Sequence, residues 1–254
     1  MTYIEENSKI WDQRSENNDK WSIPVTSEMV KNAKEGIFSI VLTPTKPVPS
    51  NWFPKNLSET KILCLASGGG QQGPILAATG ADVTVFDNSK KQLEKDEYVA
   101  QINHLKIKTV QGNMQDLSVF ADESFDCIIH PWSNGYIDNV LPVWKECARV
   151  LKKNGLLLAG FGNPIECIFN VIKLEKGIFS VENTIPYADI DHLDDPELKA
   201  LVECDGYIWG HTLEDQIQGQ IDAGFAIIGF YEDTGGSALD KYIKTSIATK
   251  AIKL

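Results

Sequence analysis

A glycine-rich stretch, Ser67-Gly68-Gly69-Gly70-Gln71-Gln72-Gly73, is the first place where this sequence could do chemistry. It lies between an apolar run at 61–66 and a predicted helix at about 72–79. Without side chains, the backbone can turn tightly and approach a ligand closely, and free amides at the start of the helix can face that ligand. The letters also satisfy the pattern GxGxxG, which a tight turn without a ligand satisfies equally well.

A carboxylate supplies a second signal. Asp87 ends the next apolar run, 82–86, and follows Gly70 by 17 residues. A carboxylate in that place can accept two hydrogen bonds from the hydroxyls of a ribose. Asp87 could instead be only the N-cap of the next helix, although Ser89 already fits that role. The glycine-rich turn and Asp87 together predict a site for a nucleoside-containing cofactor, and they fit NAD as well as S-adenosylmethionine.

Four longer segments separate these two cofactors. The segments at 61–89 (KILCLASGGGQQGPILAATGADVTVFDNS) and 110–130 (VQGNMQDLSVFADESFDCIIH) resemble the first four motifs of class I S-adenosylmethionine-dependent methyltransferases. ARVLKKNGLLLAGF at 148–161 and EDQIQGQIDAGFAIIGFYED at 214–233 resemble their later elements. The resemblance covers roughly residues 58–161 and 211–252. The opening IWDQRSENNDKW and the later TPTKPVPSNWFP look like a bacterial, type 11-like branch whose substrate we cannot name.

The resemblance implies S-adenosylmethionine as cofactor and S-adenosylhomocysteine as product. The implied cofactor-binding residues are Ala66, Ser67, Gly68, Gly69, Gly70, Gln72, Asp87, Asn88, Asn113, Met114 and His130. The turn would face the methionine portion, Asp87 the ribose, and the two asparagines with Met114 the adenine, while His130 would stand at the edge of the reaction centre. Two positions depart from the family: Cys64 and Asn113 stand where it often has acidic residues. These departures leave weaker cofactor binding open.

Polar and aromatic residues follow the fourth predicted strand, in the run His130-Pro131-Trp132-Ser133-Asn134-Gly135-Tyr136. Ligands of open α/β sheets bind at the carboxyl ends of strands, so this run is expected in the pocket. The histidine and the tyrosine could exchange a proton with the acceptor, or they could only shape the pocket, so the catalytic residue stays unknown. The candidates for the substrate pocket are Trp11, Trp132, Asn134 and Tyr136. Trp11, Trp21 and Trp52 could form a lid over the cofactor, or they could simply pack the N-terminal helices onto the sheet.

Apolar runs and helical patterns alternate through most of the chain. The predicted strands are 61–66, 82–86, 107–111, 125–129, 156–161, 225–232 and about 241–252; the predicted helices are a short one within 1–20, then 26–38, 72–79, 90–103, 139–151 and 212–223. This alternation predicts an α/β, Rossmann-like doubly wound sheet. The resemblance implies seven strands, the last antiparallel. Four prolines at 43–54 predict a stiff connector without regular structure.

The chain divides into an N-terminal helical and loop extension, 1–57, and a methyltransferase domain, 58–254. Regularity weakens at about 162–210, after the fifth strand. A stretch of this length without a clear pattern is usually functional, so we expect an insertion there that covers the substrate.

Composition excludes several classes of partner. The net charge of −11 repels phosphate backbones, so we expect no nucleic acid. The polar start lacks the features of a signal peptide, and no apolar run could span a bilayer, which predicts a cytoplasmic protein without a membrane partner. Five cysteines without a CxxC pair read as free thiols, and the acidic stretch at 189–197 lacks the spacing of a metal site.

The sequence therefore predicts a methyltransferase that acts on a small molecule, as a monomer or a homodimer. An NAD-dependent oxidoreductase is the alternative enzyme, although no YxxxK pair exists to support a short-chain dehydrogenase. A protein that only binds S-adenosylmethionine, without catalysis, is the third hypothesis.

Overall fold

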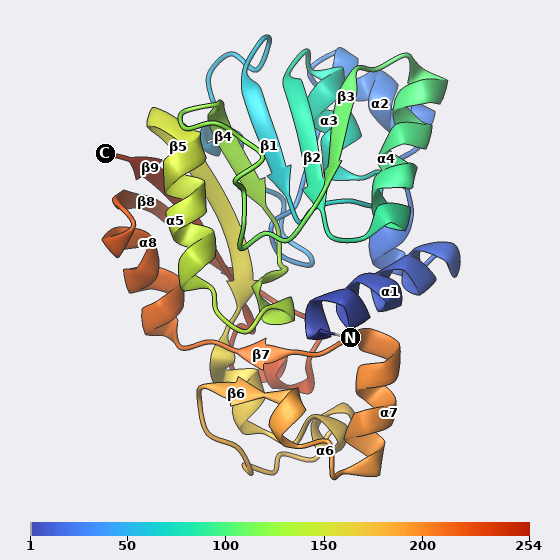
Figure 1. The fold of residues 1–254 in the computed structure, drawn as a ribbon, viewed down its shortest axis with the longest axis vertical. Helices are drawn as coiled ribbons and strands as arrows, with labels where there is room; N and C mark the ends of the chain where they lie inside the picture. Colours follow the sequence, from blue (N-terminus) through green and yellow to red (C-terminus); the bar gives the residue numbers. More distant parts are fainter. Residues whose placement is uncertain (1) are drawn as a thin grey trace.

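Seven strands form one sheet, in the order β3-β2-β1-β4-β5-β9-β8, in the computed structural model, which describes residues 2–254 (Figure 1). The strands are β1 (Lys61–Leu65), β2 (Asp82–Asp87), β3 (Ile107–Gln111), β4 (Phe125–His130), β5 (Leu151–Gly162), β8 (Phe225–Asp233) and β9 (Ser246–Lys253). Strand β9 runs antiparallel to both of its neighbours, β5 and β8. The predicted seven strands with the last one antiparallel are confirmed.

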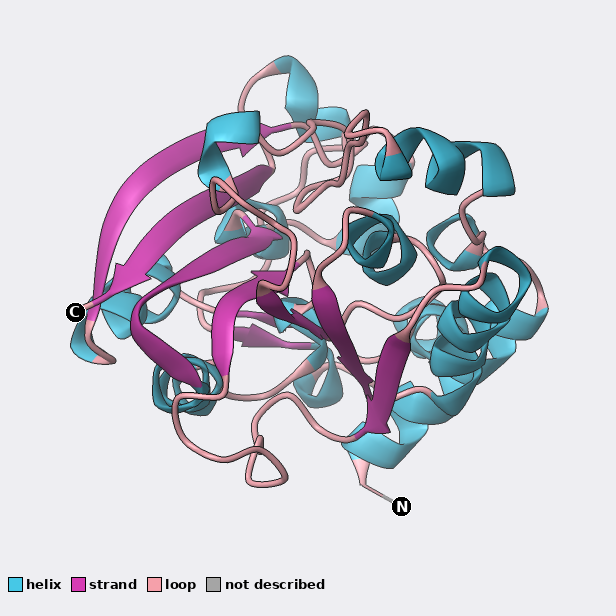
Figure 2. Cartoon of the chain, turned by 90° about the horizontal axis from the view of Figure 1, so that it is seen from above, coloured by secondary structure: helices cyan, strands magenta, loops and turns pink. Residues whose placement is uncertain are grey.

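Helices cover both faces of this sheet (Figure 2). One face carries α2 (Ser27–Lys34), α3 (Gln72–Ala78) and α4 (Lys90–Asn103); the other carries α5 (Leu141–Val150) and α8 (Gly219–Asp222). Strand β1 shows why, because its apolar side chains alternate between the two layers. Ile62 and Cys64 pack toward the first set of helices, and Leu63 and Leu65 pack toward the second.

Several predicted boundaries are wrong. The fifth strand begins at Leu151 rather than at 156, and the expected turn at Asn154 is an irregularity within it, where φ is 63°. The last strand begins at Ser246 rather than at 241, because residues 238–241 form a 3₁₀ turn. The predicted helix at 212–223 is a π-helical turn at Glu214–Gln218 followed by the short α8. Helix α2 ends at Lys34, before Gly36, although we expected it to reach 38.

Helix α1 (Tyr3–Glu16) lies across the carboxyl edge of the sheet, near α4 (Figure 1). A capping box with Thr2 and Glu5 begins this helix, as the two residue types and their spacing allow. Among residues 2–254, no helix is long and apolar enough to cross a membrane.

The proline-rich connector forms a strap over the sheet. It contains one 3₁₀ turn, Ser50–Trp52, so the expectation of no regular structure is only partly right. The Leu42 carbonyl comes so close to Gly160 that a Cβ at this glycine would lie 2.0 Å from the oxygen. The same carbonyl accepts a hydrogen bond from the Trp132 amide at 3.0 Å. The strap thus joins the middle of β5 to the loop that follows β4.

A carboxylate on β8 also holds the beginning of the strap, next to Leu42. Asp233 accepts hydrogen bonds from the Thr43 and Thr45 hydroxyls and from the Lys46 amide, at 2.8, 2.5 and 2.7 Å. Burial alone would raise the pKa of Asp233, but these hydrogen bonds lower it to about 2.

The insertion after β5 forms a small layer at the same edge of the sheet as α1 (Figure 1). It contains α6 (Val171–Glu175), α7 (Pro196–Asp205) and a two-stranded pair, β6 (Tyr187–Ala188) with β7 (Trp209–Gly210). Arg14 on α1 pairs with Asp205 on α7 at 2.9 Å. The insertion and the N-terminal helix therefore meet at the carboxyl edge.

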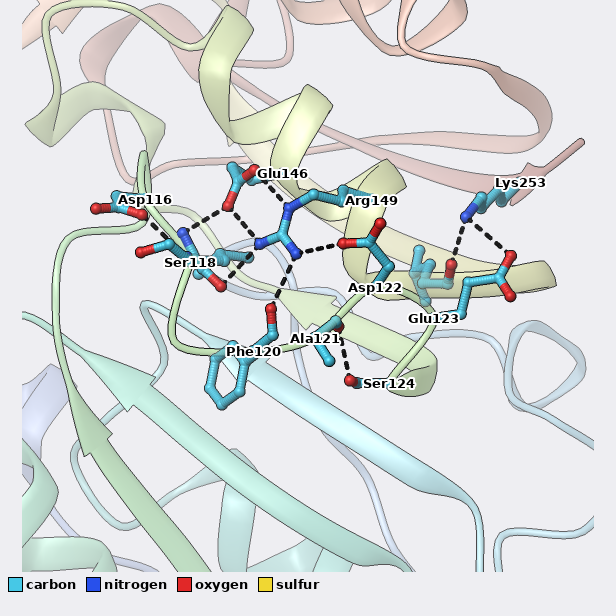
Figure 3. Close-up of polar contacts among 12 residues, drawn as sticks. Asp116, Ser118, Phe120, Ala121, Asp122, Glu123, Ser124, Glu146, Arg149 and Lys253 are labelled. Carbon is cyan, nitrogen blue, oxygen red and sulfur yellow. Dashed lines mark hydrogen bonds and ion pairs between the residues drawn. The ribbon is translucent and has the colours of Figure 1, made fainter.

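One arginine fastens the loop between β3 and β4 (Figure 3). Arg149 on α5 donates to the carbonyls of Leu117 and Phe120, at 2.8 and 2.9 Å. It also pairs with Glu146 and Asp122, at 2.7 and 2.8 Å. This loop begins with Asn113 and Met114, so the arginine fixes the segment that carries two predicted site residues.

Candidate functional site

A cavity of about 520 Å³ opens at the carboxyl edge of the sheet. It receives side chains from the first 44 residues, from the ends of β1, β2 and β4, and from the insertion. The lining residues include Ser8, Trp11, Trp21, Thr43, Ala66, Ser67, Gly68, Gln72, Asp87, Asn88, Asn113, Met114, Trp132, Tyr136 and Glu166. The topology gathers them because β1, β2 and β4 are parallel, so the loops that follow these strands meet at one edge.

Most of the predicted site residues meet in this cavity. Eight of the eleven predicted cofactor residues line it, and Gly69, Gly70 and His130 do not. Of the four substrate-pocket candidates, Trp11, Trp132 and Tyr136 line the cavity, while Asn134 does not. The roles of these residues stay predictions, because placement alone does not show what each binds.

The glycine turn is fastened by carboxylates from inside the protein. Gly69 and Gly70 take positive φ angles of 110° and 71°, which glycine adopts without strain. Both amides donate to one oxygen of Asp96, at 3.0 Å each, and the Gly68 amide donates to Asp87 at 2.8 Å. The amides of these three glycines are therefore bonded within the protein, and the expectation of free amides at the start of the following helix, α3, stays a prediction. The turn still brings backbone to the cavity wall at Ala66, Ser67 and Gly68.

Asp96 is a site residue that the sequence analysis missed. It lies on α4, is fully buried, and its second oxygen, Oδ1, has no hydrogen-bond partner within residues 2–254. Burial raises the pKa of Asp96 to about 8, although the amides of Gly70 and Gly69 oppose that rise. Its signal in the sequence is its spacing. Asp96 lies three residues from Leu93 and three from Val99, so it shares the buried face of α4 with these two apolar residues.

Asp87 both supports the turn and faces the cavity. Its oxygens accept from the amides of Gly68 and Ser89, at 2.8 and 2.9 Å. A carboxylate has about four acceptor positions, so two of them remain for a ligand. Burial raises the pKa of Asp87, and the two amides oppose this. Ser89, not Asp87, caps α4, since its hydroxyl accepts from the Gln92 amide at 3.1 Å. Ribose binding by Asp87 stays a prediction.

One hydroxyl of the turn is conspicuously unused. Ser67 is 5% exposed, lines the cavity, and its Oγ has no hydrogen-bond partner in the part of the chain that the structure describes. A buried polar atom without a partner costs about 1–3 kcal/mol. A ligand that bonds to this hydroxyl would recover that cost.

Asparagines connect the other end of the cavity to α1. The Asn88 side chain donates to the Ile4 backbone carbonyl at 2.9 Å. The backbone carbonyl of Asn88 accepts from the Ser8 hydroxyl at 2.8 Å. Asn113 bonds to the side chain and the amide of Gln115, both at 3.1 Å. Met114 lies beside it and is 9% exposed. This end combines amide groups with an apolar surface, which suits a purine base.

Comparison with known proteins places the chain in a family. A family pattern described as a methyltransferase domain matches residues 63–159. The chain is 52% identical, over 252 residues, to the Bacillus subtilis protein called uncharacterized methyltransferase YbaJ, and the match covers 99% of this chain and 98% of that one. The chain belongs to the class I S-adenosylmethionine-dependent methyltransferases.

Two further matches are more distant. A ubiquinone biosynthesis O-methyltransferase of Pelagibacter ubique is 30% identical over 103 residues, covering 41% of this chain and 42% of that one. The crystal structure of an S-adenosylmethionine dependent methyltransferase from Mesorhizobium loti superposes with a TM-score of 0.60 at 16% identity, covering 80% of this chain and 94% of that one. The cofactor of this methyltransferase is S-adenosylmethionine, and nothing in the comparisons supports the NAD-dependent oxidoreductase.

His130 lies inside the methyltransferase core rather than on the cavity wall. It is fully buried, and its ring nitrogens lie 3.0 Å from the Leu65 carbonyl oxygen and 2.6 Å from Asn134 Oδ1. Burial lowers the pKa of His130, although these two contacts oppose the shift. Asn134 continues the chain of contacts to Gln216 at 2.8 Å. Both residues therefore join the end of β4 to the π-helical turn.

Three aromatic rings form a wall of the methyltransferase cavity. Tyr136 packs edge to face with Trp11 and with Trp132, at centroid distances of 5.3 and 6.3 Å. Burial raises the pKa of Tyr136, so its hydroxyl stays protonated near neutral pH. Trp11 also carries the Arg14 guanidinium over its ring, at 4.6 Å.

The segment at 19–25 is a second feature that sequence reasoning missed. The Val25 amide donates to the Gly70 carbonyl at 2.9 Å, and the Gln71 side chain donates to the Ile23 carbonyl at 3.0 Å. Lys20 and Trp21 in this segment line the cavity beside the turn. Gln72 is tied in the same way to both backbone groups of Val41, at 3.1 and 3.3 Å. No spacing in the sequence signals these contacts, because they join segments about 30 to 50 residues apart.

Proposed function

We propose that this methyltransferase transfers its methyl group to a small molecule, bound over the carboxyl ends of β4 and β5. The observation that carries the proposal is the shape of the cavity, which extends beyond the predicted cofactor residues. Its far end is lined by Thr43 from the strap, Trp132 after β4 and Glu166 after β5. A volume of about 520 Å³ for cofactor and acceptor together leaves space for a small acceptor only.

The residues of the near end fit the cofactor. A Cβ at Gly68 would lie 2.7 Å from Gln92 and 3.1 Å from Asp87, so a side chain there would displace a group that shapes the wall. The unpaired Ser67 hydroxyl suits the polar methionine portion, and the free acceptor positions of Asp87 suit the ribose. Asn88, Asn113 and Met114 suit the adenine. S-adenosylmethionine, when bound, supplies a methyl group on a positively charged sulfur.

The protein's contribution to the transfer is then mainly position and exclusion of water. His130 is buried away from the cavity, and Tyr136 keeps its proton, so neither is set to act as a base near neutral pH. The aromatic wall and the strap would instead hold the acceptor atom in line with the methyl group. An acceptor atom that still carries a proton would pass it to water or to a carboxylate of the wall.

We infer the cytoplasm as the place of action. Five free cysteines support this, because thiols persist in a reducing compartment. A net charge of −11 supports a small molecule over a nucleic acid.

Calorimetry with S-adenosylhomocysteine tests the cofactor residues. We expect micromolar binding to the wild type and at least ten-fold weaker binding to Asp87→Asn, since a bond to a charged acceptor contributes about 1.5–3 kcal/mol. Asp82→Asn is the matched control, because Asp82 is an exposed acid at the opposite end of the same strand. Equal affinity of Asp87→Asn and wild type would reduce Asp87 to a support of the glycine turn. A screen of methyl acceptors with radiolabelled cofactor would then test the small-molecule proposal.

A further inference from the structure

The charges around the cavity are unevenly distributed. Among the described residues that line it, Lys20 alone carries a full positive charge. This lysine belongs to the cofactor end, because its carbonyl accepts from Gln71 of the glycine turn and its ammonium lies 4.9 Å from the Trp21 ring. The lining carboxylates are Asp87, Glu166, Glu175 and Asp205. The cavity lining is therefore acidic overall.

Three of the four carboxylates have a partner or a solvent-exposed position. Asp87 accepts from two backbone amides, Asp205 pairs with Arg14 at 2.9 Å, and Glu175 is exposed at the end of α6. Glu166 has the Ser237 hydroxyl beside its carboxylate, but it differs from them in having neither a charged partner nor a fully exposed position. Within residues 2–254, no lysine, arginine or histidine lies within ion-pair distance of its carboxylate.

Glu166 stands just beyond the carboxyl end of β5, in the 3₁₀ turn at Pro164–Ile168. Burial raises the pKa of Glu166 to about 7, the Ser237 hydroxyl opposes the rise, and nearby Asp240 adds to it. Without a cation, these surroundings favour the neutral form of Glu166. A positively charged group in the cavity would stabilise the ionised form.

Aromatic rings line the same end. The Trp132 indole packs against Gly162, the last residue of β5, where a Cβ would lie 3.1 Å from the ring. Tyr136 follows at 6.3 Å between ring centroids. The faces of such rings attract cations, and tryptophan does so most strongly. Carboxylate and rings together make a surface that favours a cation and disfavours an anion.

We propose that the methyl acceptor is an amine, which binds in its ammonium form to the Glu166 carboxylate in the part of the cavity that Trp132 also lines. For transfer to this nitrogen, the ammonium first gives one proton to Glu166 or to water. The freed lone pair then bonds to the methyl carbon as the bond from that carbon to sulfur breaks, and S-adenosylhomocysteine leaves. Calling this amine the methyl acceptor rests on the proposed function. Its binding to Glu166 can be measured without any methyl transfer. A phenol or an alcohol would leave Glu166 without a countercharge, and a carboxylic acid would be repelled by it.

Three probes of similar size and different charge test this proposal: benzylamine, benzyl alcohol and benzoate. Their binding is measured by calorimetry or ligand-observed NMR at pH 8, with and without saturating S-adenosylhomocysteine. Small probes bind weakly, with dissociation constants on the order of millimolar. We expect benzylamine to bind at least ten-fold more tightly than the other two. Benzylamine binding no tighter than benzyl alcohol, which includes no binding by any probe, overturns the proposal.

Glu166→Gln assigns the preference to its residue. We expect this variant to bind benzylamine no more tightly than benzyl alcohol, while its melting temperature and its affinity for S-adenosylhomocysteine stay near those of the wild type. Glu232→Gln is the control, because Glu232 is an exposed acid on β8 and its removal changes the net charge equally. A preference for benzylamine that survives in Glu166→Gln overturns the assignment. Failure of S-adenosylhomocysteine to bind would count against the proposed function alone, since the probes are also compared without it.

Discussion

Asp96 offers the sharpest test of how the cofactor site is held. One of its oxygens accepts from the amides of Gly69 and Gly70, and the other has no partner in residues 2–254. Because burial raises the pKa of Asp96 to about 8, the folded protein keeps a proton there at neutral pH. The unfolded chain loses that proton near the ordinary value of 3.8. The free energy of unfolding should therefore fall as the pH rises between these two values.

Asp96→Asn removes this titration while keeping the shape and one acceptor oxygen. Each pH unit within the window changes the stability of the wild type relative to the variant by about 1.4 kcal/mol, so the step from pH 5.5 to 7.5 should favour the variant by about 2.7 kcal/mol. Urea unfolding at several pH values measures the difference. Other groups titrate in both proteins and cancel. Parallel pH curves for wild type and variant would refute the reasoning, because Asp96 would then be ionised in the folded state.

Asp96→Ala separates the charge from the hydrogen bonds. The Gly70 amide would lose its acceptor, whereas the Gly69 amide would keep the Gln92 carbonyl at 3.0 Å. One unsatisfied buried amide costs about 1–3 kcal/mol, and the vacated space adds to this cost. We expect the alanine variant to be destabilised at every pH and to bind S-adenosylhomocysteine at least ten-fold more weakly. Glu232→Gln, at an exposed acid on β8, should change neither property.

Three further outcomes are expected. His130→Gln should lower stability by about 1–3 kcal/mol through its buried contacts but change turnover less than ten-fold, and a larger fall in turnover would restore His130 as a candidate base. Burial lowers the pKa of His130 in the folded protein. The stability that the neutral ring contributes should therefore be lost as the pH falls below about 6.5, and unfolding of wild type and variant at several pH values measures this loss. Arg149→Lys should destabilise the protein by about 1–3 kcal/mol in urea, since lysine cannot serve two carbonyls and two carboxylates at once, and unchanged stability would contradict this account of Figure 3. Gly160→Ala should lower the melting temperature, with a cost of about 1–3 kcal/mol, because its Cβ would lie 2.0 Å from the Leu42 oxygen; an unaltered melting curve would show that the strap moves freely.

The sequence predicted most of the strands because burial leaves a local trace. Residues 62–65 are all apolar and fully buried, and Thr84 is the one polar residue in the buried stretch 83–86, as expected for parallel strands covered on both faces. The place of β9 between β5 and β8 left no such trace, and it was not predicted. It depends on pairing between strands far apart in the chain, such as β5 with β9.

The same contrast between local and distant contacts decides which site residues were predicted. Asp87 was predicted because a strand end followed by a helix fixes its place locally. Asp96 was missed because its role depends on how α4 packs against the turn, 26 residues earlier. His130 illustrates the opposite error. It was expected just after the fourth strand and is the last residue of β4, but spacing alone could not give the direction of its side chain. The ring points into the core, toward Leu65 and Trp144.

The cavity wall comes from two parts of the chain, and this affects how the substrate specificity of such an enzyme can change in evolution. The residues around the cofactor end belong mostly to the segment at 63–159 that the family shares. Much of the wall at the far end comes from outside it, including Trp11, Thr43 and Glu166. Substitutions there leave the interior of the sheet intact, so a new acceptor could be selected without loss of the ancestral fold. The N-terminal segment and the insertion are thus the parts in which relatives should differ most, and the parts to randomise when altered specificity is sought.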